Sequence, residues 1–146
     1  MNHQTITVRR VLDASREEVF DAWLDAEGMR EWMCPGPVTH CEATMDPRPG
    51  GRFRIVMHAP DMTIVNTGEF RVLDRPAKLQ FTWASSRWGL EETLITIDLL
   101  PRETRCELVL THERFPGDQS AAQLQGGWGR ILNLLADHLP RPGAAL

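Results

Sequence analysis

Six stretches of alternating residues, separated by short turn-forming segments, fill the middle of this chain. They cover residues 38–46, 52–59, 63–74, 77–85, 93–100 and 104–115. In the second stretch, for example, Phe53, Ile55 and Met57 occupy every other position. Such alternation places these side chains on one face of a strand, which can be buried while the other face meets water. With connections this short, the pattern predicts an antiparallel meander with one buried face.

A strand and two short helices are expected before the meander, and one long helix after it. Residues 5–12 are rich in β-branched side chains and predict a strand. Ser15 and Glu18 have the spacing of a capping box, which predicts a helix from there to Gly28, followed by a second short helical turn. Near the other end, one stripe of an amphipathic helix is formed by Leu124, Trp128, Ile131, Leu135 and Leu139.

A single sheet with one apolar face needs a cover, and the C-terminal helix is the element large enough to provide it. The sequence therefore predicts an α+β fold in which a curved antiparallel sheet wraps around a long C-terminal helix, with two short helices after the first strand. The 146 residues are the length of one domain. Pro140 is expected to end the helix, and residues 140–146 are expected to form a frayed tail.

The first half of this C-terminal helix has little side-chain volume. Gly126, Gly127 and Gly129 surround Trp128, although each glycine inside a helix costs about 1 kcal/mol relative to alanine. Two explanations are open. The glycines allow the helix backbone to approach the strands closely, or the missing volume is a cavity beside Trp128 that holds a ligand. A void in a core costs roughly 24 cal/mol per Å³, so space kept empty usually serves a function.

Charge and composition exclude several classes of function. The chain has 20 acidic and 16 basic residues and a formal net charge of −4, which argues against nucleic-acid and anionic-membrane binding, since both need clustered positive charge. No apolar run approaches the ~20 residues that a membrane span needs, and no signal peptide is evident. Three cysteines, an odd number, then indicate reduced thiols and a cytoplasmic location. Lys78 is the only lysine, which we interpret as the composition bias of a bacterial genome.

The common catalytic and metal-binding motifs are incomplete. His112 begins a pattern similar to the HExxH zinc motif, but Pro116 occupies the position of the second histidine. Cys34, His40 and Cys41 match no common zinc spacing and lack a fourth ligand. Cys34 also follows the end of a predicted helix, where the helix dipole disfavours a thiolate. We therefore assign no catalytic residue, no metal ligand and no cofactor.

Aromatic and apolar side chains are the expected lining of a cavity between sheet and helix. The residues that we expect to contact a ligand there are Trp32, Met57, Phe70, Trp83 and Trp128. His112 faces inward by strand parity and is a sixth expected contact, with Glu69 or Glu91 as further polar groups. For His112 two roles stay open: a general acid or base in the cavity, or a core histidine that is hydrogen-bonded to the backbone.

Several segments resemble those of one known family and occur in its order. They are VRRVLDASREEVFDAWLDAEGMREWMCP, GGRFRIVM, GEFRVLDRPAKLQFTW, LTHERF and GGWGRILNLLADHL. Over residues 5–139 the chain resembles the START-like (SRPBCC) superfamily, and within it the branch named after the activator of the heat-shock protein 90 ATPase. The resemblance implies a helix-grip fold with a cavity between sheet and helix. One departure is the run WMCP at residues 32–35, where the family often has two tryptophans and a glycine before the proline, in a loop by the cavity mouth.

The resemblance and the low side-chain volume in the first half of the C-terminal helix together predict a protein that binds a hydrophobic or aromatic small molecule in an internal cavity. Members of the superfamily bind hydrophobic small molecules, cyclise polyketides, take up lipids or assist a chaperone. Two alternatives therefore stay open: a chaperone-associated interaction module, and a cavity-based cyclase, dehydratase or hydrolase with His112 as acid or base. The fold class also allows a homodimer.

Overall fold

The computed structural model describes residues 3–117 and 119–139. The strands are β1 (His3–Leu12), β2 (His40–Met45), β3 (Arg52–His58), β4 (Thr63–Asp74), β5 (Lys78–Ser85), β6 (Glu92–Arg102) and β7 (Arg105–Pro116). The helical elements are α1 (Arg16–Ala22), α2 (Ala26–Met29), the 3-10 turn η1 (Ser86–Trp88) and α3 (Ala121–His138). The predicted order of elements is confirmed, while the predicted frayed tail, residues 140–146, lies outside the described residues.

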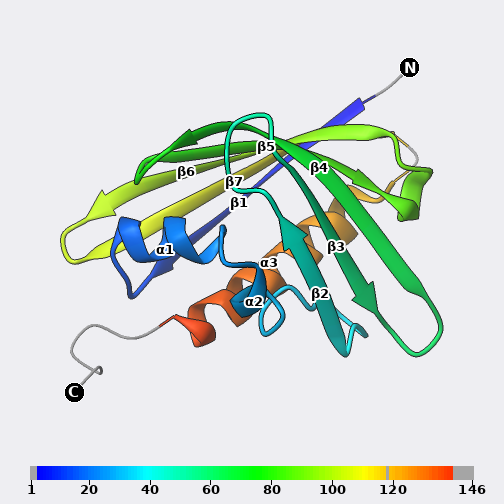
Figure 1. Ribbon diagram of the computed structural model, residues 1–146, viewed down its shortest axis with the longest axis horizontal. Coiled ribbons are helices and arrows are strands. Elements are labelled where there is room, and N and C mark those ends of the chain that lie inside the picture. The colour runs from blue at the N-terminus through cyan, green and yellow to red at the C-terminus, as the bar shows by residue number, and fades with distance from the viewer. Residues whose placement is uncertain (1–2, 118, 140–146) are drawn as a thin grey trace.

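The strands form one antiparallel sheet in the order β1-β7-β6-β5-β4-β3-β2. From β2 to β7, strands that follow one another in the chain are also neighbours in the sheet, as a meander predicts, and β1 completes the other edge by pairing with β7. The sheet is curved, and α3 crosses the inside of the curve (Figure 1). This arrangement confirms the predicted α+β helix-grip fold.

The core lies between the concave face of the sheet and α3. The predicted stripe of α3 is buried, with exposed fractions of at most 7% for Leu124, Trp128, Ile131, Leu135 and Leu139. From the sheet, the inward positions of β3 and β5 bury Phe53, Ile55, Met57, Leu79, Phe81 and Trp83. Burial of each large apolar side chain contributes roughly 1.5–3 kcal/mol to folding, so these two stripes hold the helix inside the sheet.

The first two helices differ from the prediction in where they end. Ser15 accepts a hydrogen bond from the Glu18 N–H (3.1 Å) and the Glu18 carboxylate accepts one from the Ser15 N–H (3.0 Å), so the predicted capping box is present. The prediction that Gly28 ends this helix is wrong. Helix α1 ends at Ala22, and Asp25 starts α2 by accepting a hydrogen bond from the Gly28 N–H. The short side chain of Asp25 caps α2, as aspartate commonly does, so the chain starts a second helix here and α1 does not continue to Gly28.

A β-bulge near the end of β7 turns two rings into the core. The register between β1 and β7 shifts at Arg114, which has a φ of 68° and is exposed. Because of this extra residue, His112 and Phe115 both point inward, and their ring centroids lie 5.5 Å apart. Bulges commonly re-aim side chains beside functional sites, and this one lies next to the cavity described below.

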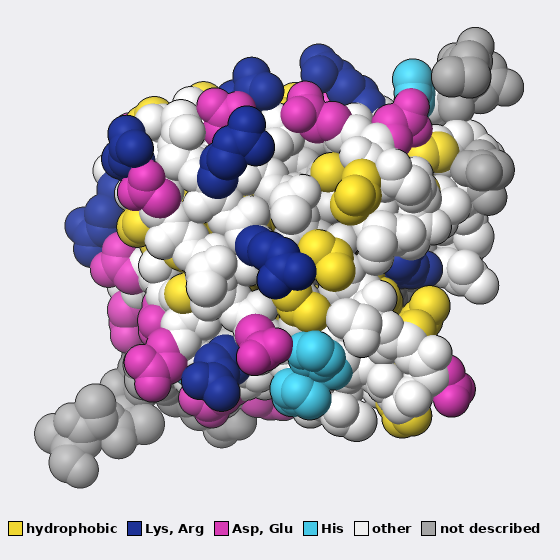
Figure 2. Space-filling view, turned by 45° about the vertical axis from the view of Figure 1, so that its right-hand side comes forward, with side chains coloured by type: hydrophobic (Ala, Val, Ile, Leu, Met, Phe, Trp, Pro, Cys, Tyr) yellow, Lys and Arg dark blue, Asp and Glu magenta, His cyan; other side chains and the backbone are white. Residues whose placement is uncertain are grey.

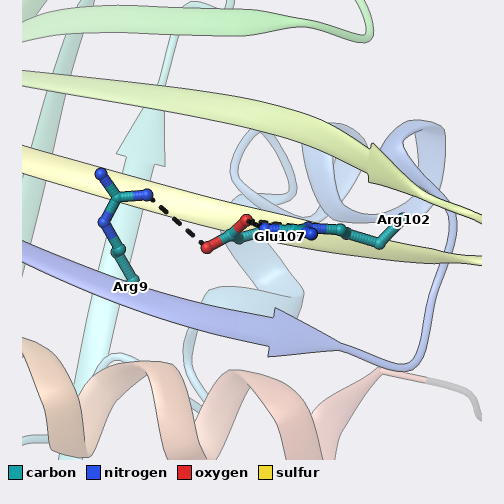
Figure 3. A network of polar contacts seen from close by, with 3 residues as sticks. All are labelled: Arg9, Arg102 and Glu107. Carbon is teal, nitrogen blue, oxygen red and sulfur yellow. Dashed lines mark hydrogen bonds and ion pairs between the residues drawn. The ribbon is translucent and has the colours of Figure 1, made fainter.

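On the outer face of the sheet, Glu107 joins arginines from two neighbouring strands (Figure 3). Arg102 Nε donates to Glu107 Oε1 over 2.9 Å, and Arg9 Nη1 lies 3.6 Å from Glu107 Oε2. The Glu107 side chain is only 10% exposed. The hydrogen bond from Arg102 lowers the pKa of the Glu107 carboxyl below its usual value.

Replacing Glu107 with glutamine should lower the free energy of unfolding at pH 7. It should also make this free energy fall less as the pH is lowered. A carboxyl whose pKa is lowered by folding stabilises the protein above the unfolded pKa, about 4.3 for glutamate, and this stabilisation is lost as the pH falls through the folded value. Urea unfolding at pH 7 and at acidic pH measures the effect. Glu113→Gln, on the same face of the same strand, is the matched control; an equal change in both variants would contradict a special role of the arginine contacts.

Candidate ligand-binding cavity

A cavity of about 480 Å³ lies between the sheet and the first half of α3. Its buried wall combines side chains of β3, β4, β5 and α3, among them Met57, Ile64, Trp83, Leu124, Trp128 and Ile131. Its exposed rim includes the loop after α2, the β3–β4 turn, η1 and α3. Small-molecule sites in proteins are typically mostly apolar and roughly 300–1,000 Å³ in volume, and this cavity has both properties.

The glycines of α3 leave this space open. Gly126 and Gly127 line the cavity, and a Cβ added to either would meet no neighbouring atom of the described residues within 4 Å. Close packing looks different: at Gly68 a Cβ would lie 2.0 Å from the Thr82 carbonyl oxygen. Of the two explanations left open by the sequence, close approach of the helix to the strands is therefore wrong. The missing volume is a cavity beside Trp128.

Four of the six expected ligand contacts line the cavity: Met57, Trp83, His112 and Trp128. Trp32 and Phe70 are buried but lie elsewhere in the core. Trp32 packs edge-on against Trp23 with ring centroids 4.9 Å apart, and Phe70 packs against Phe53 at 5.3 Å. The cavity wall thus brings together Trp83 of β5 and Trp128 of α3, but it does not include Trp32 or Phe70.

His112 is completely buried and uses both of its ring nitrogens. Trp128 Nε1–H donates to His112 Nδ1 over 3.1 Å. Because an indole N–H can only donate, Nδ1 must be the acceptor, and the proton of the neutral ring lies on Nε2, which donates to Thr93 Oγ1 over 2.8 Å. The Thr93 hydroxyl in turn donates to the Trp83 carbonyl. His112 is thus bonded to side chains, not to the backbone as one of the two expected roles required.

Burial lowers the pKa of His112 to about 4. The ring is therefore neutral near pH 7, and its one basic lone pair already accepts the hydrogen bond from Trp128. An acid or base must reach the proton that it transfers, so catalysis by His112 would first have to break this bond. The geometry gives His112 a different role: by accepting the hydrogen bond from Trp128, it holds the Trp128 ring in place. The Trp128 ring packs edge-on against Trp83 in the cavity wall, with ring centroids 5.3 Å apart.

Two buried polar side chains of the cavity wall were not predicted. Asn66 and Ser85 face each other across β4 and β5 and are 2% and 1% exposed. Asn66 Nδ2 donates to the Ile55 carbonyl over 3.3 Å, and no described residue donates a hydrogen bond to its Oδ1. A signal for both was present in the sequence, because Asn66 follows Ile64, and Ser85 follows Trp83, at the spacing of two that marks an inward position.

The rim of the cavity carries two arginines that sequence patterns did not indicate. Arg87 lies in η1, between the strands predicted at residues 77–85 and 93–100; Ser85 caps η1 by accepting a hydrogen bond from the Arg87 N–H over 3.2 Å. Arg130 lies on α3, and both side chains are exposed. The polar groups expected instead, Glu69 and Glu91, are not among the residues that line the cavity.

The loop after α2 lines the cavity with residues 35–38. Of the run at residues 32–35 that the resemblance placed by the cavity mouth, only Pro35 is among the lining residues. The thiols that flank this loop point elsewhere: Cys34 Sγ and Cys41 Sγ donate to the carbonyls of Arg30 and Met29 over 3.7 and 3.3 Å. Burial raises the pKa of Cys34 and raises that of Cys41 to about 12, so both thiols stay protonated. In the described parts of the chain, no three His, Cys, Asp or Glu side chains are placed to hold a metal ion.

A curved sheet that holds a long C-terminal helix, with a cavity between them, defines a helix-grip protein. The family model described as "Activator of Hsp90 ATPase homolog 1-like protein" matches residues 13–140. The chain therefore belongs to this family. A search of curated proteins finds no match.

Solved bacterial structures share the fold over nearly the whole chain. Protein CV1439 from Chromobacterium violaceum is 23% identical with a TM-score of 0.82, and the match covers 93% of this chain and 97% of that one. Protein Mll3558 from Rhizobium loti is 24% identical with a TM-score of 0.80 and coverages of 94% and 98%. A putative uncharacterized protein from Rhizobium leguminosarum is 23% identical, with a TM-score of 0.80 and 94% coverage of both chains. At these identities the likeness establishes the fold.

Proposed function

We propose that this protein binds a hydrophobic or aromatic small molecule in the cavity between the sheet and α3. The observation that carries the proposal is the open volume of about 480 Å³ beside Gly126 and Gly127, where a side chain would meet nothing. Trp83 and Trp128 offer aromatic surface, and Asn66 and Ser85 offer neutral hydrogen-bonding groups. A mostly apolar pocket with a few placed polar groups is the usual form of a small-molecule site.

Titration with N-phenyl-1-naphthylamine, an uncharged apolar fluorophore, tests the proposal. We expect its emission to rise on binding and tryptophan emission to fall by energy transfer, because Trp83 and Trp128 would contact the probe. The titration should saturate at one probe per chain. Unchanged emission for this probe and for a broad panel of apolar compounds, with protein whose circular dichroism shows it to be folded, would contradict the proposal.

The alternative functions have less support from the structure. The chaperone-associated alternative rests on the family description. On the face shown in Figure 2, acidic and basic side chains are intermixed and hydrophobic atoms lie in small separate groups, so this face offers no broad apolar docking surface. The catalytic alternative has to explain how His112 would exchange a proton while both ring nitrogens are engaged. A homodimer stays a prediction.

The proposed location is the cytoplasm. Cys34, Cys41 and Cys106 are free thiols, as a reducing compartment would keep them. None of the helices in the described residues is long and apolar enough to cross a membrane.

A further inference from the structure

The charged groups that line the cavity in the described parts of the chain are all positive. Among these lining residues, Arg87 and Arg130 are the ones charged at pH 7, because His112 is neutral and no described aspartate or glutamate contributes. The chain as a whole has the opposite balance, with 20 acidic and 16 basic residues. A lining that reflected the overall composition would contain acidic groups, so the charge of the cavity rim differs from the overall charge balance of the chain.

Neither arginine is neutralised by the described parts of the chain. No carboxylate of residues 3–117 or 119–139 lies within 4 Å of the Arg87 or Arg130 guanidinium. Elsewhere in the protein, Arg75 pairs with Asp21 at 2.9 Å, whereas Arg52 and Arg54 likewise have no described carboxylate within 4 Å. A guanidinium has five N–H donors in a planar fork that matches carboxylate and phosphate oxygens, and at the rim these donors are directed to no described side chain.

The charged groups of the cavity lie at its rim, whereas its buried wall is uncharged at pH 7. Both arginines are exposed and lie on different elements, η1 and α3, whereas the interior beside them is formed by buried residues such as Ile64, Leu124 and Ile131. A molecule that fits this arrangement has an apolar body and one charged end. Because the charged end would remain partly in water, the desolvation cost that penalises buried ion pairs would be small.

We propose that the ligand is an amphipathic anion whose acidic group binds Arg87 and Arg130 at the rim while its apolar body fills the cavity. This inference rests on the proposed function and adds the chemical class of the ligand. It also fixes the orientation of the ligand, with the acidic group outward. Binding should weaken with salt, since the contacts are exposed to solvent and the Debye length falls to about 3 Å at 1 M ionic strength.

Calorimetric titration with three ten-carbon probes of equal chain length tests the inference: decanoate, decanol and decyltrimethylammonium. Decanoate should bind about tenfold more tightly than decanol, as expected for two partly exposed charge contacts, and the cation should bind most weakly. The preference for decanoate should shrink in 1 M NaCl. Equal affinity for decanoate and decanol would overturn the inference but leave the proposed function standing, whereas no binding of any probe would overturn both.

The double variant Arg87→Gln with Arg130→Gln assigns the effect to these two side chains. It should lose about tenfold in affinity for decanoate and keep its affinity for decanol. The matched control is Arg52→Gln with Arg54→Gln, which removes the same charge from exposed positions on β3 and should leave both affinities unchanged. An equal loss for decanoate and decanol in the rim variant, or an equal loss for decanoate in the control, would overturn the inference.

Discussion

Acidification from pH 7 to pH 4 is expected to destabilise the fold by about 3 kcal/mol through His112 alone. In the folded protein burial lowers the pKa of His112 from 6.5 to about 4. Between these two values the unfolded chain binds more protons than the folded one. The stabilisation that comes from burying a neutral ring is therefore complete above about pH 6.5 and is lost progressively as the pH falls toward 4.

Urea unfolding of the wild type and of His112→Gln across this pH range measures the effect. The variant should already be less stable at pH 7, by about 1–3 kcal/mol, because the Trp128 N–H and Thr93 lose a well-placed partner. The difference between the two curves should then narrow as the pH falls, since carboxyl groups titrate equally in both proteins. His3→Gln, at an exposed position of β1, is the control and should follow the wild type. A constant difference between wild type and His112→Gln would show that His112 does not titrate in this way.

The fold could be predicted because its elements are encoded in local patterns. The alternation at Phe53, Ile55 and Met57 fixes which face of β3 is buried, and the steps of three and four from Leu124 onward fix the buried stripe of α3. A boundary such as the end of α1 is harder to predict from the sequence. Gly28 is compatible both with the end of one helix and with a position inside the second helix, which Asp25 caps.

The site was predicted less well because it depends on distances between elements. Trp32 and Phe70 were chosen for their aromatic character, yet being buried does not by itself place a side chain at a cavity wall. Asn66 could have been found, since it occupies an inward position of an apolar strand. Arg87 could not, because η1 follows no periodic pattern and its place at the rim arises only when β5 and α3 are brought together.

The glycines of α3 also show that the sequence does not predict features that depend on distances between elements. Sequence alone reveals that Gly127 contributes no side-chain volume, but not whether a strand or empty space takes its place. The position of the sheet decides this, and the atoms around Gly127 lie beyond 4 Å of an added Cβ in the described structure. The question that the sequence leaves open is therefore answered by packing, and the answer can be tested by filling the space.

Replacing Gly127 with phenylalanine should strongly weaken the binding of apolar ligands while making the fold more stable. Gly127 is half-buried and lies three residues after Leu124 and four before Ile131, on the same face of α3 as these two buried residues. Because Gly127 lines the cavity, a side chain there would enter it. Helix propensity favours phenylalanine over glycine by about 0.5 kcal/mol, and burial of part of the ring adds to this. We expect the free energy of unfolding to rise by about 1 kcal/mol and the affinity for N-phenyl-1-naphthylamine to fall at least about tenfold, which corresponds to 1.4 kcal/mol.

Gly129→Phe separates the cavity from the helix propensity. A Cβ on Gly129 also meets no described atom within 4 Å, but Gly129 lines a second hollow, beside Val8 and Leu132 on β1 and α3. This hollow shares Gly126 and Arg130 with the cavity, but Gly129 does not line the cavity itself. This variant should gain helix propensity and still bind the probe. If Gly127→Phe bound the probe as tightly as the wild type, the ligand would have to lie elsewhere, and if it unfolded more easily, the glycine would be needed for packing. A more stable protein that no longer binds would mean that α3 keeps Gly127 at the expense of stability because the empty space is used.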